Sequence, residues 1–155
     1  MQKTTLIILV FGAVIAACAA IKKQSLAKLQ QGIEGRVVRL TGNQMPMQNR
    51  RQASTPKGLA TTVYMFEVAN ISQTKRQGST ALYDSIHTKR IATVQTDSAG
   101  HFAVHLPVGS YSIFVKVGNG FYANRFNEQN NINVYRVEKG KLTQVEVMVS
   151  EGAVF

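Results

Sequence analysis

Apolar and polar residues alternate with a period of two in several short runs between residues 33 and 149. Successive side chains of a β-strand point to opposite faces, so this alternation predicts half-buried strands. The clearest run follows the turn sequence Asp97–Gly100, in which an Asp opens and a Gly closes the turn. We expect it to have a core face and a solvated face, formed respectively by Phe102, Val104 and Leu106 and by His101, Ala103 and His105.

Similar runs predict further strands, and the run at 61–68 is expected to be central because it is rich in β-branched and aromatic residues. About seven strands at spacings of about ten residues, without a convincing helix after the N-terminal segment, predict an all-β fold. The fold expected is a single antiparallel β-sandwich. Its strands are predicted at 33–40, 61–68, 90–96, 101–106, 111–117 (Tyr111, Ile113 and Val115 inward), 131–137 and 143–149 (Val145, Val147 and Val149 inward).

The N-terminal segment has a different character. An unbroken apolar run from Leu6 to Ala16 follows one basic residue, Lys3. This run is shorter than the roughly 20 residues needed to span a bilayer, and it is typical of the hydrophobic region of a signal peptide. Alternatives are an ordinary secretory signal cleaved near Ala20 and an anchor that is never cleaved. The expected organisation is a signal peptide at 1–17, a polar and basic tether at 18–31, and one domain at 32–155.

The tetrapeptide IAAC at Ile15–Cys18 resembles the lipobox of bacterial lipoproteins. The resemblance implies diacylglycerol transfer to the Cys18 sulfur, cleavage before Cys18 and acylation of the new amine. Several acyl chains anchor a protein stably where one does not. The expectation is therefore membrane attachment through the N-terminal lipid, in the bacterial outer membrane and facing the periplasm. Cys18 is the only cysteine, so no disulfide is expected in the domain.

A second resemblance lies at about residues 91–117, where the chain fits the patterns T-D-x-x-G-x-F and L-P-x-G-x-Y. The stretch resembles the carboxypeptidase regulatory-like domain, a transthyretin-like relative of the immunoglobulin sandwich. The resemblance implies an Ig-like sandwich that serves as an accessory unit. Two stretches, 42–58 and 70–89, are predicted as inserted loops. The matching residues are Thr96, Asp97, Gly100, Phe102, Leu106, Pro107, Gly109 and Tyr111.

The formal net charge of +10 favours an acidic partner or surface. Basic residues are scattered in pairs without the interleaved aromatics of a single-strand binder, so no nucleic-acid partner is expected. An envelope protein or a glycan is the expected partner.

Candidate chemistry is sparse. His101 and His105 would lie about 13 Å apart on a strand, at four rises of about 3.3 Å, too far for one zinc ion. No metal site and no cofactor is expected, and no Gly-x-Ser-x-Gly elbow occurs. Transthyretin-like hydrolases end in a Tyr-Arg-Gly-Ser type motif, whereas this chain ends SEGAVF. A non-enzymatic interaction or accessory module is expected, with a carbohydrate-binding module and then a small hydrolase as the alternatives.

Two stretches are candidates for binding. Residues 118–133 mix aromatic rings with amides, as binding loops do. The competing interpretation is that Phe121 and Tyr122 begin a strand with one ring packed inward, and that the asparagines satisfy turns. The second candidate is a basic pair near Met45 and Met47, which a solvated loop would explain equally well. The candidate residues are Phe121, Tyr122, Asn124 and Phe126 in the first stretch and Arg50 and Arg51 in the second.

Overall fold

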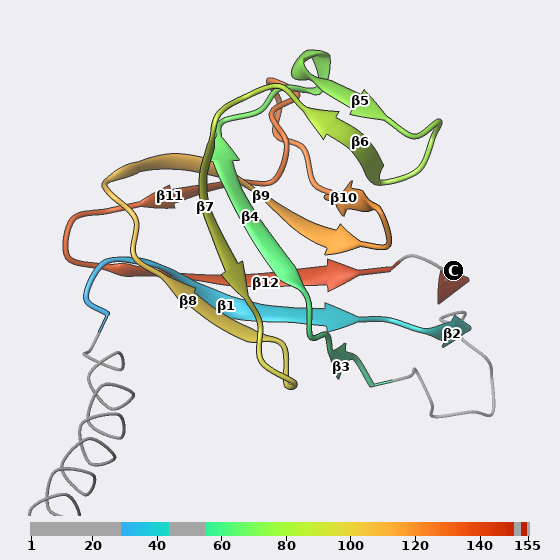
Figure 1. Cartoon of the computed structure of the whole chain (residues 1–155), viewed down its shortest axis with the longest axis horizontal. Helices are drawn as coiled ribbons and strands as arrows, with labels where there is room; N and C mark the ends of the chain where they lie inside the picture. The colour runs from blue at the N-terminus through green and yellow to red at the C-terminus, as the bar shows by residue number, and fades with distance from the viewer. Residues whose placement is uncertain (1–28, 44–54, 151–152, 155) are drawn as a thin grey trace, which may run out of the picture.

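The computed structural model describes residues 29–43, 55–150 and 153–154 (Figure 1). These residues form an all-β fold of two sheets, as predicted. The strands outnumber the seven or so expected because several are only two or three residues long. They are β1 (Gly32–Arg39), β2 (Gly42–Asn43), β3 (Lys57–Gly58), β4 (Thr62–Glu67), β5 (Thr74–Arg76), β6 (Leu82–Ile86), β7 (Arg90–Gln95), β8 (His101–Val104), β9 (Gly109–Val117), β10 (Gly120–Tyr122), β11 (Val134–Val137), β12 (Leu142–Val149) and β13 (Ala153–Val154).

The four-stranded sheet contains β12, β1, β3 and β8. Strand β1 pairs with β12 on one side and with β8 and β3 on the other. The pairing of β1 with β12 is parallel, and so is that of β2 with β13, so the prediction of a purely antiparallel sandwich is wrong at these two pairs. Alternation reports which face of a strand is buried and carries no information on the direction of its neighbour. The parallel pair is visible where β1 and β12 run side by side (Figure 1).

The seven-stranded sheet has the order β5-β6-β10-β9-β4-β7, with β11 paired to β9. Strand β4 lies between β9 and β7, which confirms the central position predicted for the run at 61–68. The segment 70–89, predicted as a loop, instead contains a short 3-10 helix, η1 (Ile71–Gln73), and the strands β5 and β6. That prediction was wrong because strands of three and five residues are too short to show a clear period.

The core lies between the two sheets, and the predicted inward-facing residues occupy it. Phe102 and Leu106 are buried while His101, Ala103 and His105 are exposed, and Val104 is half-buried. On β12, Val145, Val147 and Val149 are also buried, as predicted. The cluster includes Ile33, Val37, Val63, Met65, Phe102, Tyr111, Ile113, Val115, Val145, Val147 and Val149.

A second cluster covers the opposite face of the seven-stranded sheet. Phe114 on β9 and Phe66 on β4 meet edge-to-face with their ring centroids 5.7 Å apart. The segments 70–89 and 123–133 supply the cover, so β9 is buried on both faces and the one-sided alternation predicted for it is wrong. The buried members are Phe66, Ala69, Tyr83, Phe114, Ala123 and Ile132.

Within the described ranges, no helix has the length and apolar character needed to cross a membrane.

Candidate binding surface

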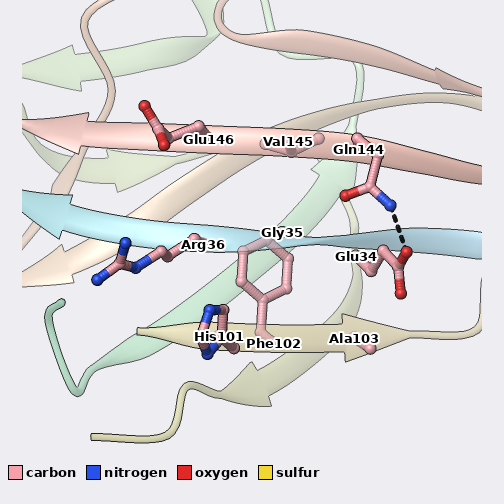
Figure 2. A pocket seen from close by; sticks show the side chains of 9 residues that line it. All are labelled: Glu34, Gly35, Arg36, His101, Phe102, Ala103, Gln144, Val145 and Glu146. Carbon is pink, nitrogen blue, oxygen red and sulfur yellow. Dashed lines mark hydrogen bonds between the residues drawn. The ribbon is translucent and has the colours of Figure 1, made fainter. Parts of the chain in front are cut away.

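A hollow with a volume of about 720 Å³ lies over the four-stranded sheet. We call it the outer groove. It forms over a block of three consecutive residues from each of three adjacent strands, because Gly35 on β1 is opposite Val145 on β12 and Phe102 on β8. The nine lining residues are Glu34, Gly35, Arg36, His101, Phe102, Ala103, Gln144, Val145 and Glu146 (Figure 2).

The outer groove has a backbone floor and polar walls. Phe102 and Val145 at its middle belong to the core cluster, and Gly35 between them has no side chain. A Cβ added to Gly35 would lie 1.9 Å from the Val145 carbonyl oxygen, so only glycine fits this position. The residues before and after these three point to the other face, which leaves polar side chains on both sides of the floor.

One end of the groove is a row of three residues, His101, Arg36 and Glu146, which the strand registers place side by side. Arg36 Nε donates a 2.9 Å hydrogen bond to the Ala99 carbonyl. His101 Nδ1 lies 3.4 Å from Asp97 Oδ2. Both side chains are therefore held by the turn between β7 and β8.

Asp97 organises that turn. Its Oδ1 accepts hydrogen bonds from the backbone N–H groups of His101 at 2.8 Å and Ala99 at 2.9 Å. The hydrogen bond from the His101 backbone is the main cause that holds the pKa of the Asp97 carboxyl below its usual value. Asp97 therefore acts as a turn residue, as predicted, and as an ionised neighbour of His101.

The other end of the groove carries Glu34 and Gln144, which are joined by a hydrogen bond from the Gln144 amide to the Glu34 carboxylate (Figure 2). Glu146, one pleat further along β12, is exposed and makes no hydrogen bond or ion pair within the described part of the chain. The outer groove thus presents a guanidinium and an imidazole near one free carboxylate, and a second carboxylate that is already bonded.

The histidines do not form a metal centre. His105 Nδ1 lies 2.9 Å from the Gln31 carbonyl oxygen, and His87 Nε2 lies 3.1 Å from Ser85 Oγ. Over the residues that the structure describes, no three His, Cys, Asp or Glu side chains are grouped to hold a metal ion. Both His101 and His105 are exposed, as the strand alternation predicted.

The candidate stretch 118–133 divides into a buried part and an exposed part. Tyr122 is 2 % exposed, and its hydroxyl lies 3.0 Å from Ser150 Oγ, so this ring belongs to the core and the prediction of a binding role for it is wrong. Phe121 is half-buried and packs edge-to-face on Tyr64 with a centroid separation of 5.1 Å. Asn124 is exposed, with its side chain available to solvent.

Phe126 remains on the surface, with 42 % of its area exposed. The Arg76 guanidinium lies over its ring, 6.0 Å from the centroid. Phe126 lines a smaller hollow of about 340 Å³, which also involves Arg125 and Tyr135. Phe126 is therefore the most exposed of the three candidate aromatic residues of this stretch.

The asparagines of this stretch mainly satisfy turns, as the competing interpretation holds. Asn127 Oδ1 accepts hydrogen bonds from the backbone N–H groups of Gln129 and Asn131. Asn130 and Asn133 adopt the left-handed conformation, at φ of 60° and 47°, which asparagine tolerates better than most residues. Asn133 is buried and donates to the Ile113 carbonyl at 2.8 Å.

Cys18, Arg50 and Arg51 lie outside the described residues. The sequence did not predict the outer groove. Of its polar residues, only His101 was considered from sequence, as a possible metal ligand. Its other polar residues come from strands 110 positions apart, as in the pair Glu34 and Gln144, and a single sequence does not show such pairing.

Comparisons with protein-family models, with curated proteins and with solved structures gave no match. The resemblances to bacterial lipoproteins and to the carboxypeptidase regulatory-like domain therefore stay predictions.

Proposed function

We propose that the protein is a lipid-anchored envelope protein whose β-sandwich is a non-catalytic interaction module for another protein, bound at the outer groove. The observation that carries the proposal is that the outer groove is open to solvent and is lined by both acidic and basic side chains. One of these, the Glu146 carboxylate, has no partner within the described residues. A protein surface supplies the cationic and anionic groups that would complement Glu146, Arg36 and His101. The attachment through Cys18, in the outer membrane and facing the periplasm, is part of the same proposal.

The test is recovery of a partner with the full chain from detergent-solubilised membranes. Reversing the free carboxylate by Glu146→Lys, combined with His101→Ala, is expected to reduce recovery about tenfold, because a like charge replaces a complementary one. Glu128→Lys, at an exposed position outside the groove, is the matched control and is expected to leave recovery unchanged. Equal recovery with the groove variant and the control would contradict the groove assignment.

The anchor has its own test. Mass spectrometry of the native polypeptide is expected to show an N-terminal Cys18 that carries acyl chains, and Cys18→Ser is expected to release the protein from the membrane fraction. An unmodified thiol on a soluble product would contradict the anchor.

Carbohydrate binding is the second candidate, and the smaller hollow favours it. Phe126 is exposed, and Arg125 beside it is also exposed and makes no hydrogen bond through its side chain in the described ranges. An acidic polysaccharide would stack a sugar ring on Phe126 and place a carboxylate near Arg125. Retardation of the protein in a polysaccharide gel is then expected to depend on Phe126, whereas retardation unaffected by Phe126→Ala would remove this candidate.

A further inference from the structure

The outer edge of β12 is the longest sheet edge in the described part of the chain. Strand β12 pairs along its whole length with β1 on one side, without a register shift, and with no described strand on the other. The other edge strands are shorter, and the pairings of β5 and β7 each contain a register shift. Such shifts and short lengths protect a sheet edge from further pairing, and β12 has neither.

The backbone groups that face this outer edge can be identified from two hydrogen bonds at its ends. The Lys141 carbonyl accepts from Gly32 N–H, and the Val149 carbonyl accepts from Leu40 N–H, so odd-numbered positions of β12 point toward β1. The N–H and C=O of one residue point to the same side of a strand, and neighbours alternate. Even-numbered positions therefore point outward, and Ser150 N–H agrees, because it donates to Tyr122 Oη on that side.

Four alternate residues of β12 thus each present an N–H and a C=O at the outer edge. Their side chains alternate with the buried valines, so they lie on the same face as the outer groove. Two of them, Gln144 and Glu146, are exposed, and the other two are half-buried. The four residues are Leu142, Gln144, Glu146 and Met148.

This edge is complementary to itself. If a second copy approaches antiparallel with the two-fold axis at Val145, Gln144 lies opposite Glu146 of the second copy, and Leu142 lies opposite Met148. Each such pair exchanges two backbone hydrogen bonds, so all four outward residues of each chain are satisfied. A shift by two residues in either direction would place Glu146 opposite Glu146 or Leu142 opposite Glu146, so this register avoids a like-charge pair and a charged–apolar pair.

We propose that two copies of the chain associate by antiparallel pairing of their β12 edges in this register, which joins their four-stranded sheets into one continuous sheet. The surface buried by one strand pair is smaller than that of a standard protein–protein interface, so the association is weak in dilute solution. It strengthens where the chains are held at high local concentration. The proposal does not depend on a partner for the outer groove.

Disulfide trapping tests the register, with the full chain in detergent and in a Cys18→Ser background. Residues opposite each other in a hydrogen-bonded antiparallel pair have Cα atoms about 5.5 Å apart, within the range that a disulfide spans. A mixture of Gln144→Cys chains and Glu146→Cys chains is expected to give a dimer containing one of each. Either variant alone is expected to give much less, because its own cysteines are offset along the strands. No cross-link in the mixture, or equal cross-linking in all three samples, would overturn the proposal.

A proline variant tests the edge without a cysteine. Glu146 N–H points away from β1, so Glu146→Pro removes an outward donor and leaves the pairing with β1 intact. Sedimentation of the full chain is expected to show a concentration-dependent dimer for the native chain and for the control Glu146→Gln, and a monomer for Glu146→Pro with an unchanged thermal midpoint. A native chain that is monomeric up to about 1 mM, the weak end of protein association, would overturn the proposal.

The two proposals fail separately. A dimer that persists in the groove variant with Glu146→Lys and His101→Ala, together with loss of the partner, would leave the edge pairing in place and locate partner binding in the groove. Loss of the partner in Glu146→Pro but not in Glu146→Gln, with a native chain that is always monomeric, would assign the edge to a strand of another protein and overturn the pairing of two copies.

Discussion

Ser112 joins three parts of the chain through one hydroxyl group. It is fully buried on β9; its Oγ donates a 2.6 Å hydrogen bond to the Ile132 carbonyl and accepts a 2.9 Å hydrogen bond from Ala69 N–H. The change Ser112→Ala leaves one backbone acceptor and one backbone donor without this partner in an apolar cluster. A buried polar group without a partner costs about 1–3 kcal/mol, so for the two groups we expect a loss of about 2–6 kcal/mol in the free energy of unfolding.

The assay is urea unfolding followed by circular dichroism, since the chain has no tryptophan. The control is Ser110→Ala, an exposed serine two residues earlier on the same face of β9, which is expected to change the free energy of unfolding by less than about 0.5 kcal/mol. A loss for Ser112→Ala as small as that of the control would refute the reasoning, because it would mean that water or a local shift satisfies both backbone groups at little cost.

Three further changes test other parts of the fold. Tyr83 has a buried hydroxyl with no hydrogen-bond partner among the described residues, and burial raises its pKa; Tyr83→Phe is therefore expected to raise the free energy of unfolding by about 1 kcal/mol, and a destabilised variant in the same urea assay would reveal a missed partner. Gly35→Ala places a Cβ against the Val145 carbonyl and is expected to lower the thermal midpoint of unfolding by at least about 5 °C; an unchanged midpoint would show that β1 and β12 can separate there at no cost. The pKa of Asp97 is lowered in the folded state, so its contribution to stability is present above the unfolded pKa and is lost as the pH falls through the folded value; Asp97→Asn is expected to flatten the acid side of a stability–pH curve below about pH 4, and an identical curve would contradict that.

Sequence reasoning was most successful where a strand has one buried face. On β8 and β12 the alternation matches the burial closely, with Phe102, Leu106 and Val147 inward. It failed on β9, where Ser112 and Phe114 are buried on the second face. The failure has a physical cause: the residues that cover this face come from 70–89, whose strands are short, and from 123–133, which forms isolated bridges and no strand, so neither segment shows a period.

The binding candidates show the same limit. Aromatic residues in a polar stretch predict a binding loop, but a ring within a few residues of a buried strand usually completes the core, and Tyr122 does so. Phe126 stays exposed because it lies beyond the end of β10, where it forms a single bridge with Ile132 beside a turn held by asparagine hydrogen bonds. The polar residues of the outer groove are ordinary strand residues one by one, and only the register of β1 with β8 and β12 assembles them.

The parallel pairing of β1 with β12 also limits how early the four-stranded sheet can form during folding. Glu34 and Gln144 are 110 residues apart in sequence, so the longest ladder of the four-stranded sheet can form only after nearly all of the intervening chain is available. Closing so large a loop is slow, and until it closes β1 has one unsatisfied side. During synthesis, β1 therefore lacks its longest partner until β12 is available, a delay that leaves the nascent polypeptide vulnerable to proteolysis and aggregation.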